Sequence, residues 1–310
     1  MTKIALLEYF APEIRPKLNS LIGDDLELLY CASNDEADRA AVMAEAEYAL
    51  VRAIKMPASF LDLAPKLRMI HQWGTGYDGI PMAEAKARGL VLARSPGVNA
   101  PSVADLTLAL MLAALRRICV GDARIRAGDW DEPDLYEIGR DLTGATVGLV
   151  GYGAIAREVE KRLLGFDCKV LHNRASGGAG SVPLPELLGQ VDILSLHCPS
   201  TPQTRHLLNA ETLAQMRPGA VVINTGRGDL IDEQALTDAL ISGHIAAAGL
   251  DAFDPEPLPI EAPIRTAPNT VLSAHSGGRT RDNFARIVRH WAGNIRAHAN
   301  GQPIDPRCLL

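Results

Sequence analysis

Three loops in the second half of the chain carry residue types that can do chemistry. Each loop follows an apolar run typical of a buried strand. The first contains Arg227 between two glycines, the second is the acidic, proline-rich segment AGLDAFDPEP (248–257), and the third contains His275 before a Gly-Gly turn. Because ligands of open α/β sheets bind outside the carboxyl ends of the strands, we expect these loops to gather at one edge of a sheet.

Together these residue types match the reduction of a carbonyl group that lies next to a carboxylate. Arg227 can bind the carboxylate through its forked guanidinium, and a protonated His275 can donate a proton to the carbonyl oxygen. The acid that orients the imidazole would be Asp251, Asp254 or Glu256. Taken singly, the three features have ordinary alternatives: a surface arginine, a solvated acidic turn and a structural histidine. Their combination at successive strand ends favours a site.

A glycine turn further upstream predicts a dinucleotide-binding site. Residues 147–174 (VGLVGYGAIAREVEKRLLGFDCKVLHNR) read as strand, turn, helix and strand, and Gly151, Gly153 and Ala156 form the pattern G-x-G-x-x-A at the turn. The first glycine permits the tight turn, the second lets phosphates approach the backbone, and the alanine is small enough for helix–strand packing. The N-terminus of such a helix can hold a pyrophosphate.

The bulk properties suit a metabolic enzyme. The chain has 310 residues, of which 47% are hydrophobic and 22% charged, so it has room for two domains. A formal net charge of −6 argues against nucleic acid or an anionic membrane as the main partner. No apolar run reaches membrane-spanning length, and residues 1–10 lack a signal-peptide pattern. The five cysteines show no metal-ligand spacing, so we expect reduced thiols, no metal and a cytoplasmic protein.

The first hundred residues form α/β units of their own. Strand-like runs at residues 3–8, 49–54 and 68–71 alternate with helical stretches and lack a phosphate-binding glycine pattern. Residues 94–101 are rich in proline and glycine and suit an interdomain hinge. Residues 101–119 predict one long helix that is apolar around most of its circumference, which burial between domains or at a dimer interface would explain.

Seven segments, taken in order, resemble the D-isomer-specific 2-hydroxyacid dehydrogenases over residues 49–287. They are GTGYDGI (74–80), SPGVNAPSVADLTLALMLA (95–113), the glycine turn, LHCPSTPQTRHLL (196–208), INTGRGDLIDEQAL (223–236), GLDAFDPEP (249–257) and AHSGGRT (274–280). Several long motifs in the right order are far more specific than any one of them.

The resemblance implies a role for each candidate catalytic residue. Arg227 matches the arginine that binds the substrate carboxylate and polarises the keto group. His275 matches the acid/base histidine, and Glu256 matches the glutamate paired with it. Asp251 matches an aspartate that contacts the nicotinamide amide, whereas Asp254 receives no role.

The resemblance also implies the residues that hold the substrate and the cofactor. Thr75 and Gly76 match a loop whose backbone N–H groups receive the substrate carboxylate, and Arg52 matches a position where some members hold a second anionic group. Trp73, beside that loop, is bulkier than usual and either narrows the pocket or packs in the core. Cofactor contacts are expected at Gly151, Tyr152, Gly153, Ala154, Ile155, Asn173, Arg174, Cys198, Pro199, Thr204, Thr225, Gly226, Asp251 and Gly277.

The resulting architecture is α/β, with two Rossmann-like domains and the active site in the cleft between them. We expect the cofactor domain, residues 99–284, to be inserted into a discontinuous flavodoxin-like substrate domain made of residues 1–98 and 285–310. The second crossing is expected near residues 281–287. A homodimer through the helix at 101–119 is expected by resemblance and from its apolar surface.

The expected cofactor is NADP in preference to NAD. NAD sites place an acid at the end of the second strand, about twenty residues past the glycine turn, to bind the ribose 2′-hydroxyl. Here that position falls on Asn173 or Arg174, and neither is acidic. Arg174 could pair with a 2′-phosphate. The region from residue 174 to residue 191 is shorter than usual in the family, so the adenosine side is expected to be more open.

The expected reaction is reversible hydride transfer between NAD(P)H and a small 2-keto acid, yielding a D-2-hydroxy acid. Glyoxylate and hydroxypyruvate are the preferred substrates. The alternatives are a 3-phosphoglycerate dehydrogenase-like enzyme that uses Arg52 for the phosphate of 3-phosphohydroxypyruvate, or a reductase of a larger apolar keto acid. A third alternative, from another functional class, is an NAD(H)-sensing protein that resembles a corepressor and binds partners without turnover.

Overall fold

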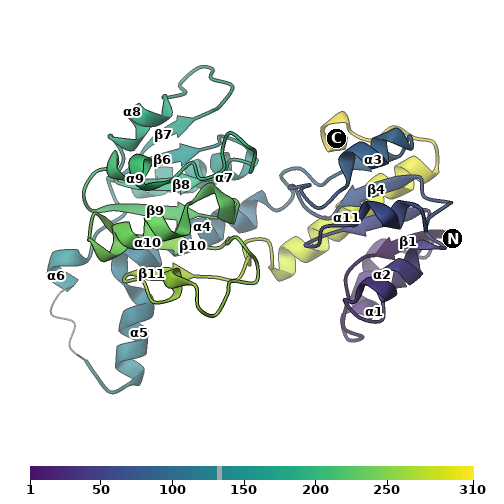
Figure 1. The fold of residues 1–310 in the computed structure, drawn as a ribbon, viewed down its shortest axis with the longest axis horizontal. Helices are drawn as coiled ribbons and strands as arrows, with labels where there is room; N and C mark the ends of the chain where they lie inside the picture. The colour runs from purple at the N-terminus through teal and green to yellow at the C-terminus, as the bar shows by residue number, and fades with distance from the viewer. Residues whose placement is uncertain (131–134) are drawn as a thin grey trace. The chain divides into compact units, whose positions relative to one another are not determined.

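Two compact units make up the chain. The computed structural model describes residues 1–130 and 135–310. Unit 1 comprises Met1–Asn99 and Thr280–Leu310, and unit 2 comprises Ala100–Arg279. Each unit is a parallel sheet with helices packed on it, so the predicted pair of Rossmann-like α/β units is confirmed (Figure 1).

The sheet of unit 1 has five parallel strands in the order β2-β1-β3-β4-β5. This is the flavodoxin-like order, and its switch point lies between β1 and β3. The strands are β1 (Thr2–Leu6), β2 (Leu26–Tyr30), β3 (Tyr48–Val51), β4 (Met69–Gln72) and β5 (Val91–Ala93). After the last helix the chain returns to this sheet, where Leu309 makes an antiparallel bridge with Ala93 at the edge.

Helices cover both faces of this sheet, because its strands are apolar on both sides. Ile4 and Leu6 of β1 belong to one core cluster with Trp291 of the last helix, and Ala5 and Leu7 belong to another on the opposite face. The helices are α1 (Arg15–Ile22), α2 (Glu36–Met43), α3 (Met82–Ala87) and α11 (Arg281–Ala299), with short 3₁₀ turns η1 (Ala58–Leu61) and η5 (Pro306–Cys308).

The sheet of unit 2 has six parallel strands in the order β7-β6-β8-β9-β10-β11. One isolated parallel bridge, His172 to Ser181, lies beyond β7. Counting it as a vestigial third strand gives the Rossmann order, and it occupies the short region after Arg174. The strands are β6 (Thr146–Val150), β7 (Lys169–Asn173), β8 (Ile193–Leu196), β9 (Ala220–Asn224), β10 (Ile245–Leu250) and β11 (Thr270–Leu272).

Helices lie on both faces of this sheet as well. Alternate residues of β9 face opposite cores: Val222 packs with the side of α8 to α10, and Val221 with the side of α4 and α7. The helices are α4 (Ala100–Arg116), α5 (Ile118–Arg126), α6 (Leu135–Ile138), α7 (Ala154–Leu163), α8 (Leu184–Leu188), α9 (Ala210–Ala214) and α10 (Glu233–Ile241), with the 3₁₀ turns η2 (Leu164–Phe166), η3 (Gly228–Leu230) and η4 (Pro263–Arg265).

The helix predicted over residues 101–119 is wrong at its C-terminal end. α4 stops at Arg116, Arg117 adopts a left-handed backbone (φ 52°), and α5 begins anew at Ile118. A left-handed residue breaks the i to i−4 hydrogen-bond ladder. The apolar circumference of α4 is largely explained within unit 2, since the helix packs on α7, β9, β10 and β11.

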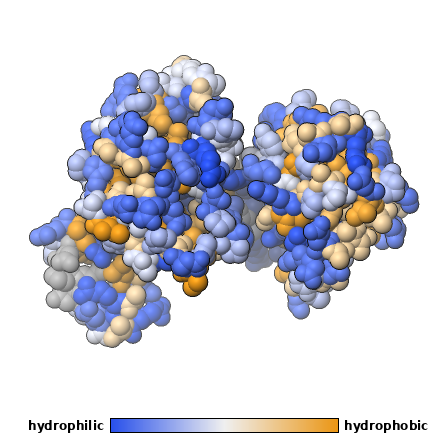
Figure 2. Space-filling view, viewed as in Figure 1, coloured by the Kyte–Doolittle hydropathy of each residue, from blue (hydrophilic) through white to orange (hydrophobic). Residues whose placement is uncertain are grey.

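Hydrophilic and hydrophobic residues are interspersed on the face of the molecule that Figure 2 shows. Several large apolar side chains are nevertheless well exposed around α5 and α6, among them Ile118, Ile125, Trp130 and Tyr136. Within residues 1–130 and 135–310, no helix combines the length and apolar character needed to cross a bilayer.

Candidate active site

The glycine turn joins β6 to α7 at the switch point of unit 2. Gly151 has φ +88°, and a Cβ there would lie 2.4 Å from the backbone nitrogen of Cys198, which follows β8. Only glycine fits this close approach. Gly153 is the N-cap of α7 with no side-chain cap, and a Cβ built on it meets no atom within 4 Å. The uncapped N–H groups therefore face open space, as a pyrophosphate site requires.

The end of β7 has no acid. The Asn173 amide donates to the carbonyl oxygen of Val182 (2.8 Å), so part of its predicted capacity for the cofactor is used inside the protein. Arg174 folds back over the glycine turn, where its Nη2 donates to the carbonyl oxygen of Tyr152 (3.1 Å). The rings of His172 and Tyr152 stack at 3.9 Å, and the guanidinium groups of Arg157 and Arg174 each lie 5.4 Å from the Tyr152 ring.

The predicted cofactor loop after β8 is held by its own side chains. Thr204 Oγ1 donates to the carbonyl oxygen of Pro199 (2.7 Å). Burial raises the pKa of the Cys198 thiol to about 11, so the thiol is neutral near pH 7. Thr225, after β9, shares a hydrogen bond with Thr107 of α4 (3.0 Å) and is almost fully buried. The hydroxyls of both threonines therefore shape the loops.

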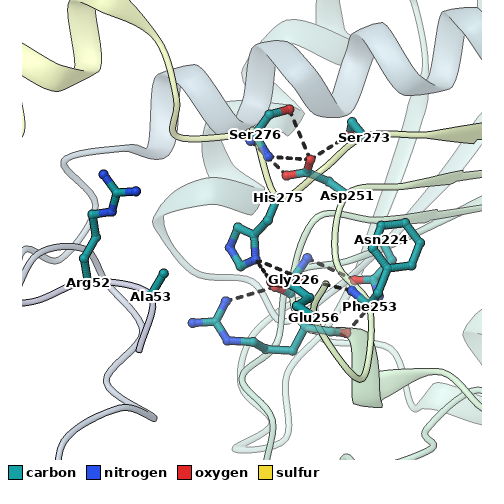
Figure 3. Close-up of polar contacts among 12 residues, drawn as sticks. Arg52, Ala53, Asn224, Gly226, Asp251, Phe253, Glu256, Ser273, His275 and Ser276 are labelled. Atoms are coloured by element: carbon teal, nitrogen blue, oxygen red, sulfur yellow. Dashed lines mark hydrogen bonds and ion pairs between the residues drawn. The ribbon is translucent and has the colours of Figure 1, made fainter. Parts of the chain in front are cut away.

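A buried asparagine at the end of β9 folds the loop that carries Arg227. Asn224 Oδ1 accepts from the N–H of Gly226 (3.0 Å), and its Nδ2 donates to the carbonyl oxygen of Arg227 (2.8 Å) (Figure 3). Arg227 Nη1 donates to the carbonyl oxygen of Gly226 (2.9 Å). A Cβ on Gly228 would lie 1.9 Å from the carbonyl carbon of Phe253, so only glycine lets this loop reach the loop after β10.

The loops after β10 and β11 bring Glu256 and His275 together. His275 Nδ1 lies 2.8 Å from Glu256 Oε2 and 3.0 Å from Oε1, and Glu256 Oε1 also accepts from the N–H of Phe253 (3.1 Å) (Figure 3). With Nδ1 engaged, Nε2 is the ring atom left for a substrate. Burial raises the pKa of Glu256, but its contacts with His275 and Phe253 and the charge of Arg227 outweigh burial and hold that pKa below its ordinary value.

Asp251 organises the loop that carries His275. Its carboxylate is buried, with Oδ1 accepting from Ser273 Oγ (2.6 Å) and the Ser276 N–H (2.7 Å) and Oδ2 accepting from the Gly277 N–H (2.8 Å). His275 itself has a left-handed backbone (φ 48°), which is costly for a residue with a side chain. The four contacts of Asp251 with Ser273, Ser276 and Gly277 stabilise that conformation (Figure 3).

The predicted substrate residues Arg52, Thr75 and Gly76 belong to unit 1, whereas the other candidates belong to unit 2. Thr75 Oγ1 lies 3.1 Å from Ser95 O and from Asn99 Oδ1, which fixes the loop after β4. Among the described residues, no protein acceptor takes the backbone N–H of Thr75 or Gly76, which suits the binding of an anion.

The aromatic side chain beside this loop packs in the core of unit 1. Trp73 is 8% exposed and lies against Phe10, Phe284 and Trp291, with ring centroids 5.5 to 6.0 Å apart. Of the two predictions for this residue, the structure therefore favours packing.

Sequence reasoning missed the residues that support the site. Asn224, Ser273 and Ser276 hold the Arg227 and His275 loops, and Glu8 pairs with Arg52 at 2.7 Å. An asparagine just before a Thr-Gly turn was a signal for Asn224, because Asx side chains bond to backbone groups two or three residues on. Across the described residues, no group of three or more His, Cys, Asp or Glu side chains is placed to hold a metal ion.

Known proteins resemble this chain over most of its length. A family model described as "D-isomer specific 2-hydroxyacid dehydrogenase, NAD binding domain" matches residues 108–277. The glyoxylate reductase of Korarchaeum cryptofilum is 36% identical over 266 residues, which are 82% of this chain and 80% of that protein. The hydroxypyruvate reductase of Thermotoga maritima is 36% identical over 254 residues (79% and 82%). The D-3-phosphoglycerate dehydrogenase of Mycobacterium bovis is 34% identical over 301 residues (94% and 56%).

Solved structures with the same fold extend the comparison. The TT0316 protein from Thermus thermophilus matches with a TM-score of 0.88 and 34% identity, covering 100% of both chains. An NADPH-dependent glyoxylate/hydroxypyruvate reductase from Sinorhizobium meliloti matches with a TM-score of 0.84 and 29% identity (100% and 98%). A D-lactate dehydrogenase from Aquifex aeolicus, solved with NAD and lactic acid, matches with a TM-score of 0.84 and 26% identity (97% and 96%).

Proposed function

This chain belongs to the D-isomer-specific 2-hydroxyacid dehydrogenases, and we propose that it reduces glyoxylate or hydroxypyruvate with NADPH. It is an NAD(P)-dependent oxidoreductase that transfers a hydride between the cofactor and a small 2-keto acid. The observation that carries the proposal is the pair formed by His275 and Glu256 beside the glycine-flanked Arg227, all at the carboxyl edge of one sheet.

In this proposal each residue of the site has one task. Arg227 binds the substrate carboxylate and orients the keto group, because a guanidinium fixes both oxygens of a carboxylate. His275 donates the proton from Nε2 to the carbonyl oxygen, and Glu256 holds the ring through Nδ1. Thr75 and Gly76 contribute backbone N–H groups toward the carboxylate. The nicotinamide, when bound, supplies the hydride.

The glycine turn and its neighbours fit such a cofactor. Gly151 and Gly153 leave room for the pyrophosphate over the uncapped start of α7. Unit 2 would thus be the cofactor domain and unit 1 the substrate domain. The remaining contacts proposed for the cofactor are Tyr152, Ala154, Ile155, Asn173, Arg174, Cys198, Pro199, Thr204, Thr225, Gly226, Asp251 and Gly277.

A preference for NADP is supported by the charge around the end of β7. A carboxylate there would repel a 2′-phosphate, and the position is held by Asn173 and Arg174 instead. Arg157 and His172 add two more basic side chains beside the same Tyr152 ring. A phosphate would draw Arg174 away from the carbonyl oxygen of Tyr152 and pair with its guanidinium.

Steady-state kinetics test the proposed function directly. The purified protein is assayed with glyoxylate, hydroxypyruvate, pyruvate and a branched apolar 2-keto acid, each with NADPH and with NADH. We expect the highest kcat/KM with NADPH and one of the first two acids, and we expect Arg174→Ala to reduce the preference for NADPH. Lys169→Ala, which changes an exposed cation of the same strand, is the matched control.

Three outcomes would contradict the proposal in different ways. A wild-type preference for NADH, or an unchanged preference in Arg174→Ala, would remove the NADP assignment. A higher kcat/KM for the branched acid would remove the substrate assignment. Tight cofactor binding without turnover of any keto acid would instead indicate an NAD(H)-sensing binding protein.

A homodimer is part of the same proposal. The exposed apolar side chains of α5 and α6, with Ile125 59% and Tyr136 99% exposed, suit burial against a second copy of the chain. Sedimentation or light scattering at micromolar concentration would measure the mass. The five unpaired thiols are compatible with the reducing cytoplasm that we propose for this protein.

A further inference from the structure

A charged pair lies at the switch point of unit 1. β1 and β3 are neighbours in the sheet, and the chain leaves them toward opposite sides of the β2-β1-β3-β4-β5 order. Ligands of open parallel sheets bind outside the carboxyl ends of the strands at such a point. Glu8 follows β1 and Arg52 follows β3, so both side chains belong to the edge where this unit would receive a ligand.

The two side chains are bound to one another. Arg52 Nε lies 2.7 Å from Glu8 Oε2, and Glu8 Oε1 accepts from the backbone N–H of Ala53. The Glu8 side chain is only 10% exposed, whereas that of Arg52 is 39% exposed. The Arg52 guanidinium also lies 5.4 Å from the ring of Phe10. Arg52 is therefore held in place by a nearly buried carboxylate.

This pairing changes what Arg52 can recognise. An arginine alone at a sheet edge attracts phosphate and carboxylate groups. Beside Glu8 the positive charge is compensated, and a second anion that approaches Arg52 meets the negative charge of Glu8 at close range. Since the carboxylate is mostly removed from water, solvent screens that repulsion only weakly.

We propose that Glu8 is a specificity-determining residue that excludes 2-keto acids bearing a second strong anion. The proposal rests on the proposed function, because it assigns the substituent that the same site accepts. The favoured substrates carry an uncharged group beyond the keto carbon, such as hydrogen or hydroxymethyl. Removal of the Glu8 charge would turn Arg52 into a binding group for phosphate.

Two substrates that differ only by a phosphate test this inference. Hydroxypyruvate and 3-phosphohydroxypyruvate are compared by kcat/KM in the wild type, in Glu8→Gln and in the double variant Glu8→Gln/Arg52→Gln. Glutamine keeps the oxygen that accepts from Ala53, so the loop can retain its shape. Glu47→Gln, which alters another partly exposed glutamate of unit 1 that lies near an arginine, is the matched control.

We expect the wild type to disfavour the phosphorylated acid. Glu8→Gln should raise its kcat/KM relative to hydroxypyruvate by roughly tenfold or more, which corresponds to about 1.4 kcal/mol. The gain should appear mainly in KM, decline with added salt and vanish in the double variant. Glu47→Gln should leave the ratio unchanged. An unchanged ratio in Glu8→Gln, or a wild type that uses both acids equally well, would overturn the inference.

A binding measurement separates this inference from the proposed function. Calorimetry of D-glycerate and 3-phosphoglycerate with the oxidised cofactor present needs no turnover, so it tests the role of Glu8 even if no keto acid is reduced. Weak binding of 3-phosphoglycerate that strengthens in Glu8→Gln supports the inference, and equal binding in both proteins refutes it. If Glu8→Gln does not fold, Glu8→Ala replaces it, with the same outcomes.

Discussion

Substitution of Asp251 by asparagine should disable the loop that carries His275 while leaving the rest of the fold intact. The carboxylate is 3% exposed and accepts four hydrogen bonds, three at Oδ1 and one at Oδ2. Asparagine keeps a single acceptor oxygen and places an NH₂ group where the other oxygen was. If its oxygen takes the Oδ1 position, the NH₂ group faces the N–H of Gly277, and two donors oppose each other in a buried site.

The magnitude follows from the contacts that are lost. A hydrogen bond to a charged group contributes about 1.5–3 kcal/mol, and a buried donor left without an acceptor costs about 1–3 kcal/mol. We therefore expect Asp251→Asn to lower the free energy of unfolding by about 3 kcal/mol. His275 needs these bonds, since its φ of 48° is unfavourable without them. A displacement of the imidazole by roughly 1 Å can cost about a hundredfold in rate, so kcat should fall by about 10- to 100-fold.

The assay measures kcat and KM for the keto acid, the Kd of the cofactor by fluorescence, and unfolding by urea. Ser273→Ala removes one bond to Asp251 and should destabilise the protein by only about 1 kcal/mol. A positioning role predicts a loss in kcat that exceeds the change in cofactor Kd. Normal kcat and normal stability in Asp251→Asn would refute this reasoning. A large rise in cofactor Kd with unchanged kcat would instead favour direct contact of Asp251 with the nicotinamide amide.

Three further predictions concern the catalytic residues and acid stability. His275→Ala should lower keto-acid reduction by about 10²- to 10⁴-fold, the range for loss of a general acid, with little change in cofactor Kd; near-normal kcat would exclude it as the proton donor. Arg227→Lys keeps the charge but loses the fork, so both KM and kcat should worsen, and normal kinetics would count against the carboxylate contact. Burial lowers the pKa of His71 to about 3 and that of His197 to about 4, from 6.5 in the unfolded chain. Because the unfolded state then binds more protons, stability should fall as pH drops below 6.5, by about 2–3 kcal/mol per histidine at pH 4.5. His71→Asn should flatten that dependence in a plot of Tm against pH, and an equally steep plot would contradict it.

The sequence was informative where one short segment contains the whole pattern. The glycine turn could be predicted because strand, turn and helix lie within 147–174, and the structure has β6, the turn and α7 there. Arg227, Glu256 and His275 each follow an apolar strand, and parallel strands deliver their ends to one edge. The fold class and the family were predicted on these grounds, and both are confirmed.

The sequence was less informative where contacts join distant residues or where the backbone conformation lacks a residue signal. Glu8 and Arg52 are 44 positions apart, and nothing near either residue announces the other. The bonds from Ser273 to Asp251 span 22 positions. Arg117 ends α4 in a left-handed conformation that glycine or asparagine usually marks, so the uninterrupted apolar pattern predicted a longer helix.

The two units show how one topology serves two kinds of recognition. In each sheet the first strand of the unit is flanked by the second and third, so each has its switch point after that strand. In unit 2, β6 is followed by Gly151, and α7 begins at Ala154 with its N–H groups uncapped, which suits a phosphate. In unit 1, β1 is followed by Glu8, and α1 begins only at Arg15. The sheet order thus determines where a ligand binds, and the residues after the first strand determine whether that place attracts a phosphate or repels it.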